Sequence, residues 1–372
     1  MNEFIVVNAL KSAGVEYVAS LPCDRNKALT KILPEHFRTI GLTREEDGVG
    51  ICAGIHLTGG KAAMSIQSSG LGNMMNALMS LTVVYGMPLP IIASWRGMEG
   101  ESIEAQIPFN KHIPEMLEAF GISYQIFSSS DDLESLPEMI EKAFEKNIVS
   151  VALIKPECWD TKDAEQHHVK RARCVEFEHT AHIAEPIMTR LEAISAIMGC
   201  VDDDTIIVSN IGVPSKEVFA SKDRTLNFYM MGSYTQATPI GMGMALNADR
   251  KVIVIDGDGS LLGSSVFPVI SSEDPDLTVI CLDNGTFGST GDQVTDAYSL
   301  VNMGAVAKAF GISNVYEVSD HKGITEAISK DQKGVKFVHV MIRPGNSRSA
   351  DIPMVAGAIK ERFMNAFSRL ET

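Results

Sequence analysis

The chain has 372 residues, of which 45% are hydrophobic, so it is long enough to form two domains with well-buried cores. Its formal net charge of -15 argues against broad nucleic-acid binding, which depends on lysine and arginine, but a small anionic substrate remains possible. No apolar run reaches the roughly 18 residues of a membrane span, and the first residues lack a signal-peptide pattern, so we expect a cytoplasmic protein without membrane contact. The 6 cysteines contain no CxxC pair, which indicates free thiols and neither an iron–sulfur cluster nor structural zinc.

The first half of the chain alternates helix-like and strand-like stretches, which is typical of a doubly wound α/β domain with parallel strands. Apolar runs bounded by turn residues predict strands at 16–22, 38–43, 62–69, 88–97, 124–129 and 150–156. Helical spacing of apolar residues, or runs of small residues, predicts helices at 1–14, 27–32, 44–60, 70–86, 113–122 and 136–147.

The second half resumes this alternation after a polar stretch without periodicity. The pattern predicts helices at 188–199, 302–311 and 323–330 and a further helix in the tail. It predicts strands at 205–210, 314–318 and 336–342, a loop at 212–219, and a strand, turn and helix over 227–248. The fold class is therefore α/β. We expect two doubly wound parallel-sheet domains, 1–160 and 187–372, joined by a linker at 161–186.

The stretch 251–291 carries the strongest functional signal. Two apolar strands, 251–255 and 277–282, flank a predicted crossover helix at 261–272, so both strands run parallel. Because ligands of parallel sheets bind beyond the carboxyl ends of the strands, Asp258 and Asn284 should face one site. Their oxygens and one from Thr286 suit Mg²⁺, which prefers hard oxygen ligands and often shares its shell with phosphates. The alternative is a purely structural interpretation, in which these residues are only polar caps of two strand-to-helix turns and bind no ligand.

The GDG motif, followed about 25 residues later by a strand that ends in DNG, resembles the thiamine diphosphate motif. The resemblance implies a thiamine diphosphate-binding fold, with a pyrimidine-binding domain at 1–160 and a diphosphate-binding domain at 187–372. It also implies Mg²⁺ bound by Asp258, Asn284 and Thr286. The positions that match the family's cofactor contacts are Gln67, Ser69, Asn73, Gly232, Ser233, Tyr234, Gly257, Asp258, Gly259, Ser260, Asn284, Thr286 and Phe287.

The family also needs a glutamate at the cofactor's pyrimidine ring, and alignment with its small-residue helix places this residue at Glu45. Glu46 is the adjacent alternative. Acidic residues also favour the beginning of any helix through its dipole, so both carboxylates have a purely structural interpretation as well. The family's usual histidine pair is not evident, and His112 is a candidate proton donor.

The segments SLPC, TREEDG, QSSGLGNMMNAL, SWRGMEGE and DNGTFGSTG are similar to those of the short 2-oxoacid decarboxylases that act on phosphonopyruvate and sulfopyruvate. TREEDGVGICAG and the stretch around Arg96 and Glu101 are most similar to the sulfopyruvate decarboxylases, whose two domains are often separate α and β subunits but are fused here. The resemblance implies conversion of 3-sulfopyruvate to sulfoacetaldehyde and CO2, a step toward coenzyme M. Phosphonopyruvate decarboxylation and a non-catalytic thiamine diphosphate-binding protein remain the alternatives.

A small anionic 2-oxoacid needs cationic contacts, for which arginine is well suited because its fork of donors matches oxyanions. The candidates for these contacts are Arg25, Lys27, Arg96, Lys111 and Arg348. Arg96 is the preferred one because it directly follows an apolar strand. The resemblance further implies a homodimer or homotetramer with active sites between subunits.

Overall fold

The computed structural model describes residues 2–159, 178–180 and 185–371. The chain forms two compact units, Met1–Ala172 and Arg173–Thr372, and each is described by itself. The predicted linker at 161–186 lies mostly outside the described residues, so its bounds stay a prediction. Within the described residues, no helix combines the length and apolar character needed to cross a membrane.

Unit 1 contains a parallel sheet in the order β2-β1-β3-β4-β6-β5. Its strands are β1 (Tyr17–Ser20), β2 (Arg38–Gly41), β3 (Ala62–Gln67), β4 (Leu89–Ser94), β5 (Ser123–Phe127) and β6 (Val149–Ile154). Its α-helices are α1 (Asn2–Ser12), α2 (Lys27–Ile32), α3 (Glu45–Leu57), α4 (Gly70–Ala77), α5 (Ile107–Asn110), α6 (Ile113–Ala119) and α7 (Leu136–Lys146). On one face, apolar side chains of α1, α2 and α7 pack against the buried strands and form a continuous core.

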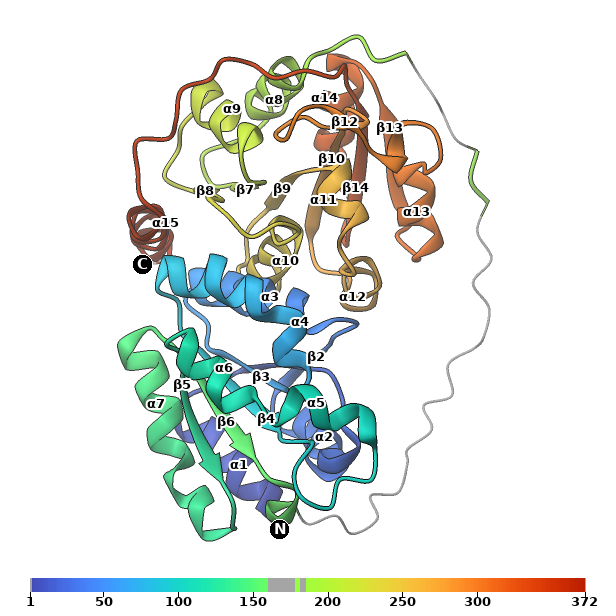
Figure 1. Ribbon diagram of the computed structural model, residues 1–372. Helices are drawn as coiled ribbons and strands as arrows, with labels where there is room; N and C mark the ends of the chain where they lie inside the picture. The colour runs from blue at the N-terminus through green and yellow to red at the C-terminus, as the bar shows by residue number, and fades with distance from the viewer. Residues whose placement is uncertain (1, 160–177, 181–184, 372) are drawn as a thin grey trace. The chain divides into compact units, whose positions relative to one another are not determined.

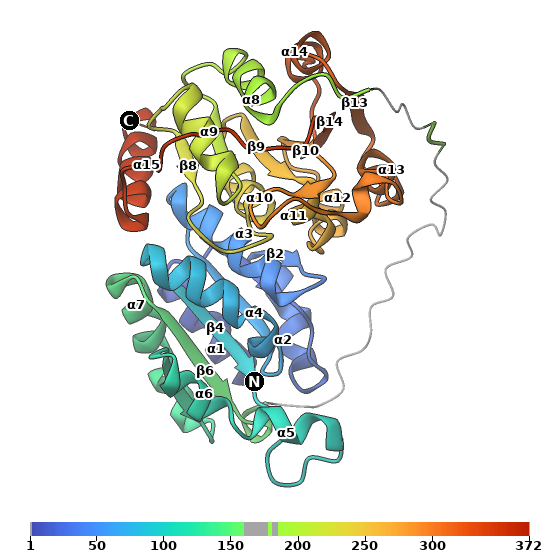
Figure 2. The same cartoon turned by 45° about the horizontal axis from the view of Figure 1, so that its top comes forward.

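Unit 2 contains a second parallel sheet, in the order β13-β14-β10-β9-β7-β8. Its strands are β7 (Ile206–Ser209), β8 (Asn227–Tyr229), β9 (Val252–Gly257), β10 (Leu277–Asp283), β13 (Asn314–Val318) and β14 (Lys336–Met341), with a small hairpin of β11 (Thr286–Phe287) and β12 (Gln293–Val294). Its helices are α8 (Arg190–Gly199), α9 (Val213–Ser221), α10 (Ala237–Asn247), α11 (Asp258–Leu262), α12 (Phe267–Glu273), α13 (Met303–Ala309), α14 (His321–Ser329) and α15 (Ala356–Leu370). Helices cover both faces of each sheet (Figures 1 and 2).

The predicted fold class is confirmed, because each unit is a six-stranded parallel sheet with flanking helices. Two local predictions were wrong. The crossover at 261–272 is not one helix but two, α11 and α12, because Pro268 is tolerated only in the first turn of a helix and a new helix starts there. The predicted loop at 212–219 forms helix α9, which places Pro214 in its first turn after Gly212 at φ 77°.

The small residues of α10 let this helix lie directly on the sheet, where it contacts β7, β9 and β10. A Cβ atom added to Gly241 would lie 2.0 Å from a methyl carbon of Val254 on β9. The close packing of the helix against the central strand β9 therefore depends on glycine at this position.

We expect Gly241→Ala to lower the free energy of unfolding by about 1–3 kcal/mol, because the added methyl group overpacks the interface. The control is Gly357→Ala in α15, where a Cβ atom would meet nothing within 4 Å and the change should be neutral or slightly stabilising. Urea denaturation of both variants checks this. Equal midpoints for Gly241→Ala and the unsubstituted protein would contradict the packing argument.

Candidate functional site

Two neighbouring strands of unit 2 end in polar side chains at one edge of the sheet. In the parallel pairing of β9 with β10, Gly257 lies opposite Leu282, so Asp258 and Asn284 both follow directly from this edge. A cavity of about 170 Å³ opens there, and both residues line it. Its other lining residues include Tyr234, Gly257, Gly259, Ser260, Thr286 and Phe287. The structure therefore brings together most of the cofactor-binding residues that the sequence places in the second half.

The carboxylate of Asp258 is buried in an acidic environment. Burial, and then the neighbouring charge of Asp283, raise the pKa of Asp258 to about 6, although Thr295 Oγ1 donates a hydrogen bond of 2.5 Å to its Oδ2. Asp256 is also buried, and burial raises its pKa. A cation at this edge would offset the cost of keeping these carboxylates ionised.

The oxygen donors at this edge fit a hard cation such as Mg²⁺. Asp258 offers a carboxylate, and Asn284 offers the amide oxygen Oδ1, which accepts the Thr286 N–H at 3.0 Å and retains a second lone pair. Among the described residues, no group of three His, Cys, Asp or Glu side chains could hold a metal. A metal here would therefore depend on neutral oxygens, on bound phosphate and on water in addition to Asp258.

The backbone around the cavity is closely fitted. A Cβ atom on Gly259 would lie 2.5 Å from the ring of Phe287, so a larger residue here would have to displace that ring. The hydroxyl of Tyr234 donates to the carbonyl of Gly259 and so joins the 232–236 turn to the GDG segment. Ser233 has a positive φ of 68°, and its buried Oγ has no hydrogen-bond partner in the described residues. The next residue, Tyr234, lines the cavity, so this hydroxyl fits a polar ligand bound nearby.

A buried arginine secures the loop that follows Asn284, and sequence reasoning missed it. Arg190 lines the cavity, and its Nε donates to Glu217 Oε2 at 2.7 Å. Its Nη2 donates to Asn346 Oδ1, and Asn346 Nδ2 donates in turn to the carbonyl of Gly288 at 2.6 Å. From the sequence, an arginine in the first turn of a predicted helix is expected to lie on the surface. Its contact with this loop is visible only in the tertiary structure.

In unit 1, the structure separates the two candidate glutamates. Glu45 begins α3, is buried, and accepts a hydrogen bond of 3.0 Å from Asn73 Nδ2. A Cβ atom on Gly70 would lie 2.4 Å from its Oε1, so the glycine makes room for the carboxylate. Glu46 is partly exposed and pairs with Arg44 at 3.4 Å. The positioned carboxylate is therefore that of Glu45.

The polar end of β3 forms a small network. Gln67 Nε2 donates to Ser69 Oγ at 2.6 Å and to Gln106 Oε1 at 3.2 Å. The thiol of Cys23 donates to Gln67 Oε1 at 3.4 Å. These contacts hold Gln67 and Ser69 next to the start of α4, which carries Asn73.

Arg96 lies buried among carboxylates. Its Nε and Nη2 donate to the two oxygens of Glu101 at 2.7 and 2.9 Å, and its Nη1 contacts Asp24 and Gln67. The hydrogen bond from Arg96 lowers the pKa of Glu101 to about 2, although burial opposes this shift. A substrate anion could reach Arg96 only by replacing one of these partners.

The remaining candidates have different settings. Arg25 is partly exposed, lies 3.6 Å from Glu101, and has a buried Nε without a hydrogen-bond partner in the described residues. The candidates that lie exposed are Lys27, Lys111, His112 and Arg348. His112 precedes α6, and its side chain does not cap that helix. No assigned role of these side chains is tested by the structure, so all of them stay predictions.

Two family models match separate parts of the chain. Residues 3–122 match the N-terminal TPP binding domain of thiamine pyrophosphate enzymes, and residues 213–342 match their C-terminal TPP binding domain. A solved structure of benzoylformate decarboxylase from Polynucleobacter necessarius matches the fold with a TM-score of 0.69 and 13% identity, over 93% of this chain and 99% of that one.

Curated relatives span almost the whole chain. Sulfopyruvate decarboxylase of Methanosarcina acetivorans is 43% identical, over 96% of this chain and 95% of its own length. Phosphonopyruvate decarboxylase of Streptomyces viridochromogenes is 29% identical, over 97% of this chain and 94% of its own length. In Methanococcus maripaludis, sulfopyruvate decarboxylase subunit alpha is 42% identical over 32% of this chain and 72% of its own length. Subunit beta of the same organism is 38% identical over 49% of this chain and 99% of its own length.

The ion pair of Glu101 with Arg96 predicts a specific pH dependence of stability. Because the folded pKa of Glu101, about 2, lies below its ordinary value of 4.5, the pair contributes stability above about pH 4.5 and loses it as the pH falls toward 2. We expect Glu101→Gln to reduce the free energy of unfolding by about 3 kcal/mol at pH 7, because Arg96 loses its charged partner. This deficit should shrink between pH 4.5 and pH 2.5.

Urea denaturation across this pH range measures the deficit, with Glu104→Gln as the control for an exposed glutamate in the same loop. A deficit for Glu101→Gln that stays constant down to pH 2.5 would contradict the assignment.

Proposed function

The chain belongs to the sulfopyruvate decarboxylase family of thiamine pyrophosphate enzymes, and we propose that it converts 3-sulfopyruvate to sulfoacetaldehyde and CO2 with thiamine diphosphate and Mg²⁺. The reaction would be a step toward coenzyme M. The observation that carries the proposal is the buried carboxylate of Asp258 beside the oxygens of Asn284 and Thr286, at the rim of a cavity lined by glycine backbone. These hard oxygen donors would hold a cation such as Mg²⁺, which would supply positive charge for the diphosphate.

Bound thiamine diphosphate would supply the electron sink that accepts the electron pair released when CO2 leaves. Asp258, Asn284 and Thr286 would hold the metal, and Gly259 would let the backbone approach the diphosphate. Ser233 Oγ would find its missing partner on the bound cofactor. The cavity of about 170 Å³ suits the diphosphate end of the cofactor, while Gln67, Ser69 and Asn73 would serve its other end.

Glu45 would exchange a proton with a ring nitrogen of the cofactor. Its burial removes competing water, and Asn73 fixes Oε2, so Oε1 on the side of Gly70 is the oxygen available for the proton. Glu46 is a weaker candidate because its carboxylate pairs with Arg44 instead.

For the sulfonate, the structure favours Arg25 over the initially preferred Arg96. The shortest ion pairs of Arg96 measure 2.7 Å or less, whereas those of Arg25 with Asp24 and Glu101 measure 3.9 and 3.6 Å. Arg25 can therefore turn toward a substrate anion at a smaller cost. Lys111 and Arg348 remain further candidates, and His112 remains a candidate proton donor.

We also propose that the chain works as a homodimer or homotetramer. The relatives that are divided into alpha and beta subunits support assembly of the two halves in one complex.

The direct test compares aldehyde formation from sulfopyruvate, phosphonopyruvate and pyruvate, with and without thiamine diphosphate and Mg²⁺. We expect kcat/KM for sulfopyruvate to exceed that for phosphonopyruvate at least about tenfold, which corresponds to about 1.4 kcal/mol of discrimination. A preference for phosphonopyruvate would establish the alternative activity. Cofactor binding without turnover of any of the three would favour a non-catalytic binding protein.

We expect Glu45→Gln to lower kcat by about 100-fold or more, because the amide cannot exchange the proton. The affinity for thiamine diphosphate in the presence of Mg²⁺ should stay within a few-fold of the original, measured by calorimetry. Glu46→Gln is the matched control on the adjacent residue and should retain most of the activity. Full turnover in Glu45→Gln would remove this residue from the mechanism.

A further inference from the structure

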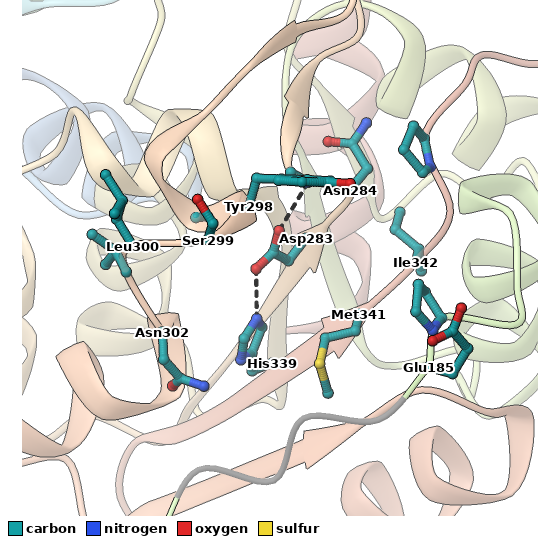
Figure 3. A pocket seen from close by; sticks show the side chains of 15 residues that line it. Glu185, Asp283, Asn284, Tyr298, Ser299, Leu300, Asn302, His339, Met341 and Ile342 are labelled. Atoms are coloured by element: carbon teal, nitrogen blue, oxygen red, sulfur yellow. Dashed lines mark hydrogen bonds and ion pairs between the residues drawn. The ribbon is translucent and has the colours of Figure 1, made fainter.

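Three titratable side chains, Glu317, His339 and Asp283, form a row of contacts across the neighbouring strands β13, β14 and β10 of unit 2. On β14, His339 is only 3% exposed and stands in register with Glu317 on β13 and with Cys281 on β10. Its Nε2 lies 2.7 Å from Asp283 Oδ2, and its Nδ1 lies 3.6 Å from Glu317 Oε1. Figure 3 shows the imidazole of His339 and the carboxylate of Asp283 pointing toward one another.

The imidazole in this row is cationic at neutral pH. Burial by itself lowers the pKa of His339, but the hydrogen bond with Asp283 and the attraction of the Asp283 and Glu317 carboxylates outweigh it and raise the pKa to about 9. Both ring nitrogens therefore carry protons, and the Nε2–H donates to Asp283. The same oxygen of Glu317 is held by Asn302, because Asn302 Nδ2 donates to Oε1 at 2.7 Å.

The other oxygen of Asp283 anchors the turn that carries Asn284. Asp283 Oδ1 accepts the backbone N–H of Gly285 at 2.9 Å. Gly285 has a positive φ of 65°, and its carbonyl accepts the N–H of Thr295 at 2.8 Å. The orientation of Asp283 therefore fixes the backbone on both sides of the amide side chain that offers its oxygen to a metal.

We propose that His339 is a positioning residue that holds the Asp283 carboxylate, and through it the Asn284 turn, in the geometry that binds the metal and the diphosphate. This inference rests on the proposed function. His339 acts through Asp283 and touches neither the metal nor the cofactor. Residues that orient a metal ligand in this way commonly change metal affinity 10–100-fold when they are replaced.

A cavity beside the row explains why Asp283 needs this partner. The cavity measures about 510 Å³ and is lined by Asp283, Asn284, Gly285 and His339. A carboxylate that lost its buried cationic partner would have room to rotate into this space and toward solvent. The hydrogen bond to Gly285 would then break, and the turn would lose its anchor.

The test compares His339→Leu, which removes the contact, with His339→Gln, which retains an N–H donor without the charge. Lys336→Met is the matched control, because Lys336 lies at the opposite end of β14, is equally buried and donates to the carbonyls of Ile328 and Lys330. For each protein, thiamine diphosphate binding is measured by calorimetry during a Mg²⁺ titration. Thermal unfolding without cofactor reports the general loss of stability.

We expect His339→Leu to need at least about tenfold more Mg²⁺ for half-maximal cofactor binding, and His339→Gln to lie between His339→Leu and the unsubstituted protein. Lys336→Met should lose stability without changing the Mg²⁺ requirement. The inference would be overturned if the Mg²⁺ requirement of His339→Leu were no higher than that of Lys336→Met. If His339→Leu does not fold, the same comparison is made with His339→Gln. An increase in Lys336→Met equal to that in the His339 variants would also overturn it, whereas absence of binding by the unsubstituted protein would instead refute the proposed function.

Discussion

The parallel pairing of β9 with β10 is the constraint on which the site in unit 2 depends. It brings the ends of two strands that are about 25 residues apart in sequence to the same edge, with Gly257 opposite Leu282. Because successive side chains of a strand point to opposite faces, a one-residue shift of β10 would turn Asp283 away from His339, and the same shift of β9 would turn Asp256 away from Thr238. The register is therefore fixed by the polar groups at the strand ends as well as by the apolar core.

The same edge concentrates negative charge where water is scarce. Each of its three carboxylates has a compensating partner: Thr238 donates to Asp256, Thr295 donates to Asp258, and the cationic His339 pairs with Asp283. Hydroxyl donors offset only part of the cost of a buried charge, which is why Asp258 retains a raised pKa. A divalent cation bound at this edge would offset the remaining cost of the buried charge. The positions of the strand ends therefore favour the proposed metal site.

Much of this was accessible from the sequence. Strand and helix alternation predicted both sheets, and the spacing of GDG and DNG placed Asp258 and Asn284 at adjacent strand ends because parallel topology leaves few alternatives. Glu45 was separable from Glu46 only in the structure, since the sequence does not show which carboxylate meets Asn73 and Gly70. The predicted helix at 261–272 failed because its apolar pattern hid the break before Pro268.

Most of the contacts that sequence reasoning missed connect distant segments. Arg96 was the preferred candidate for binding the substrate anion, but its guanidinium is already bound to Glu101 and Asp24. His339, in the apolar run KFVHVMI, reads as an ordinary core residue until the strand order β13-β14-β10 sets it between two acids. A charged or titratable residue within an otherwise apolar central strand was the available signal, and its meaning depends on which strands are its neighbours.

We propose that a cation held at the ends of β9 and β10 binds the diphosphate of the cofactor. Isothermal titration of the full chain with thiamine diphosphate, once in Mg²⁺ and once in EDTA, tests it most directly. We expect saturable binding with about one cofactor per chain in Mg²⁺ and a large loss of affinity in EDTA. Equal affinity under both conditions, or no binding under either, would contradict it.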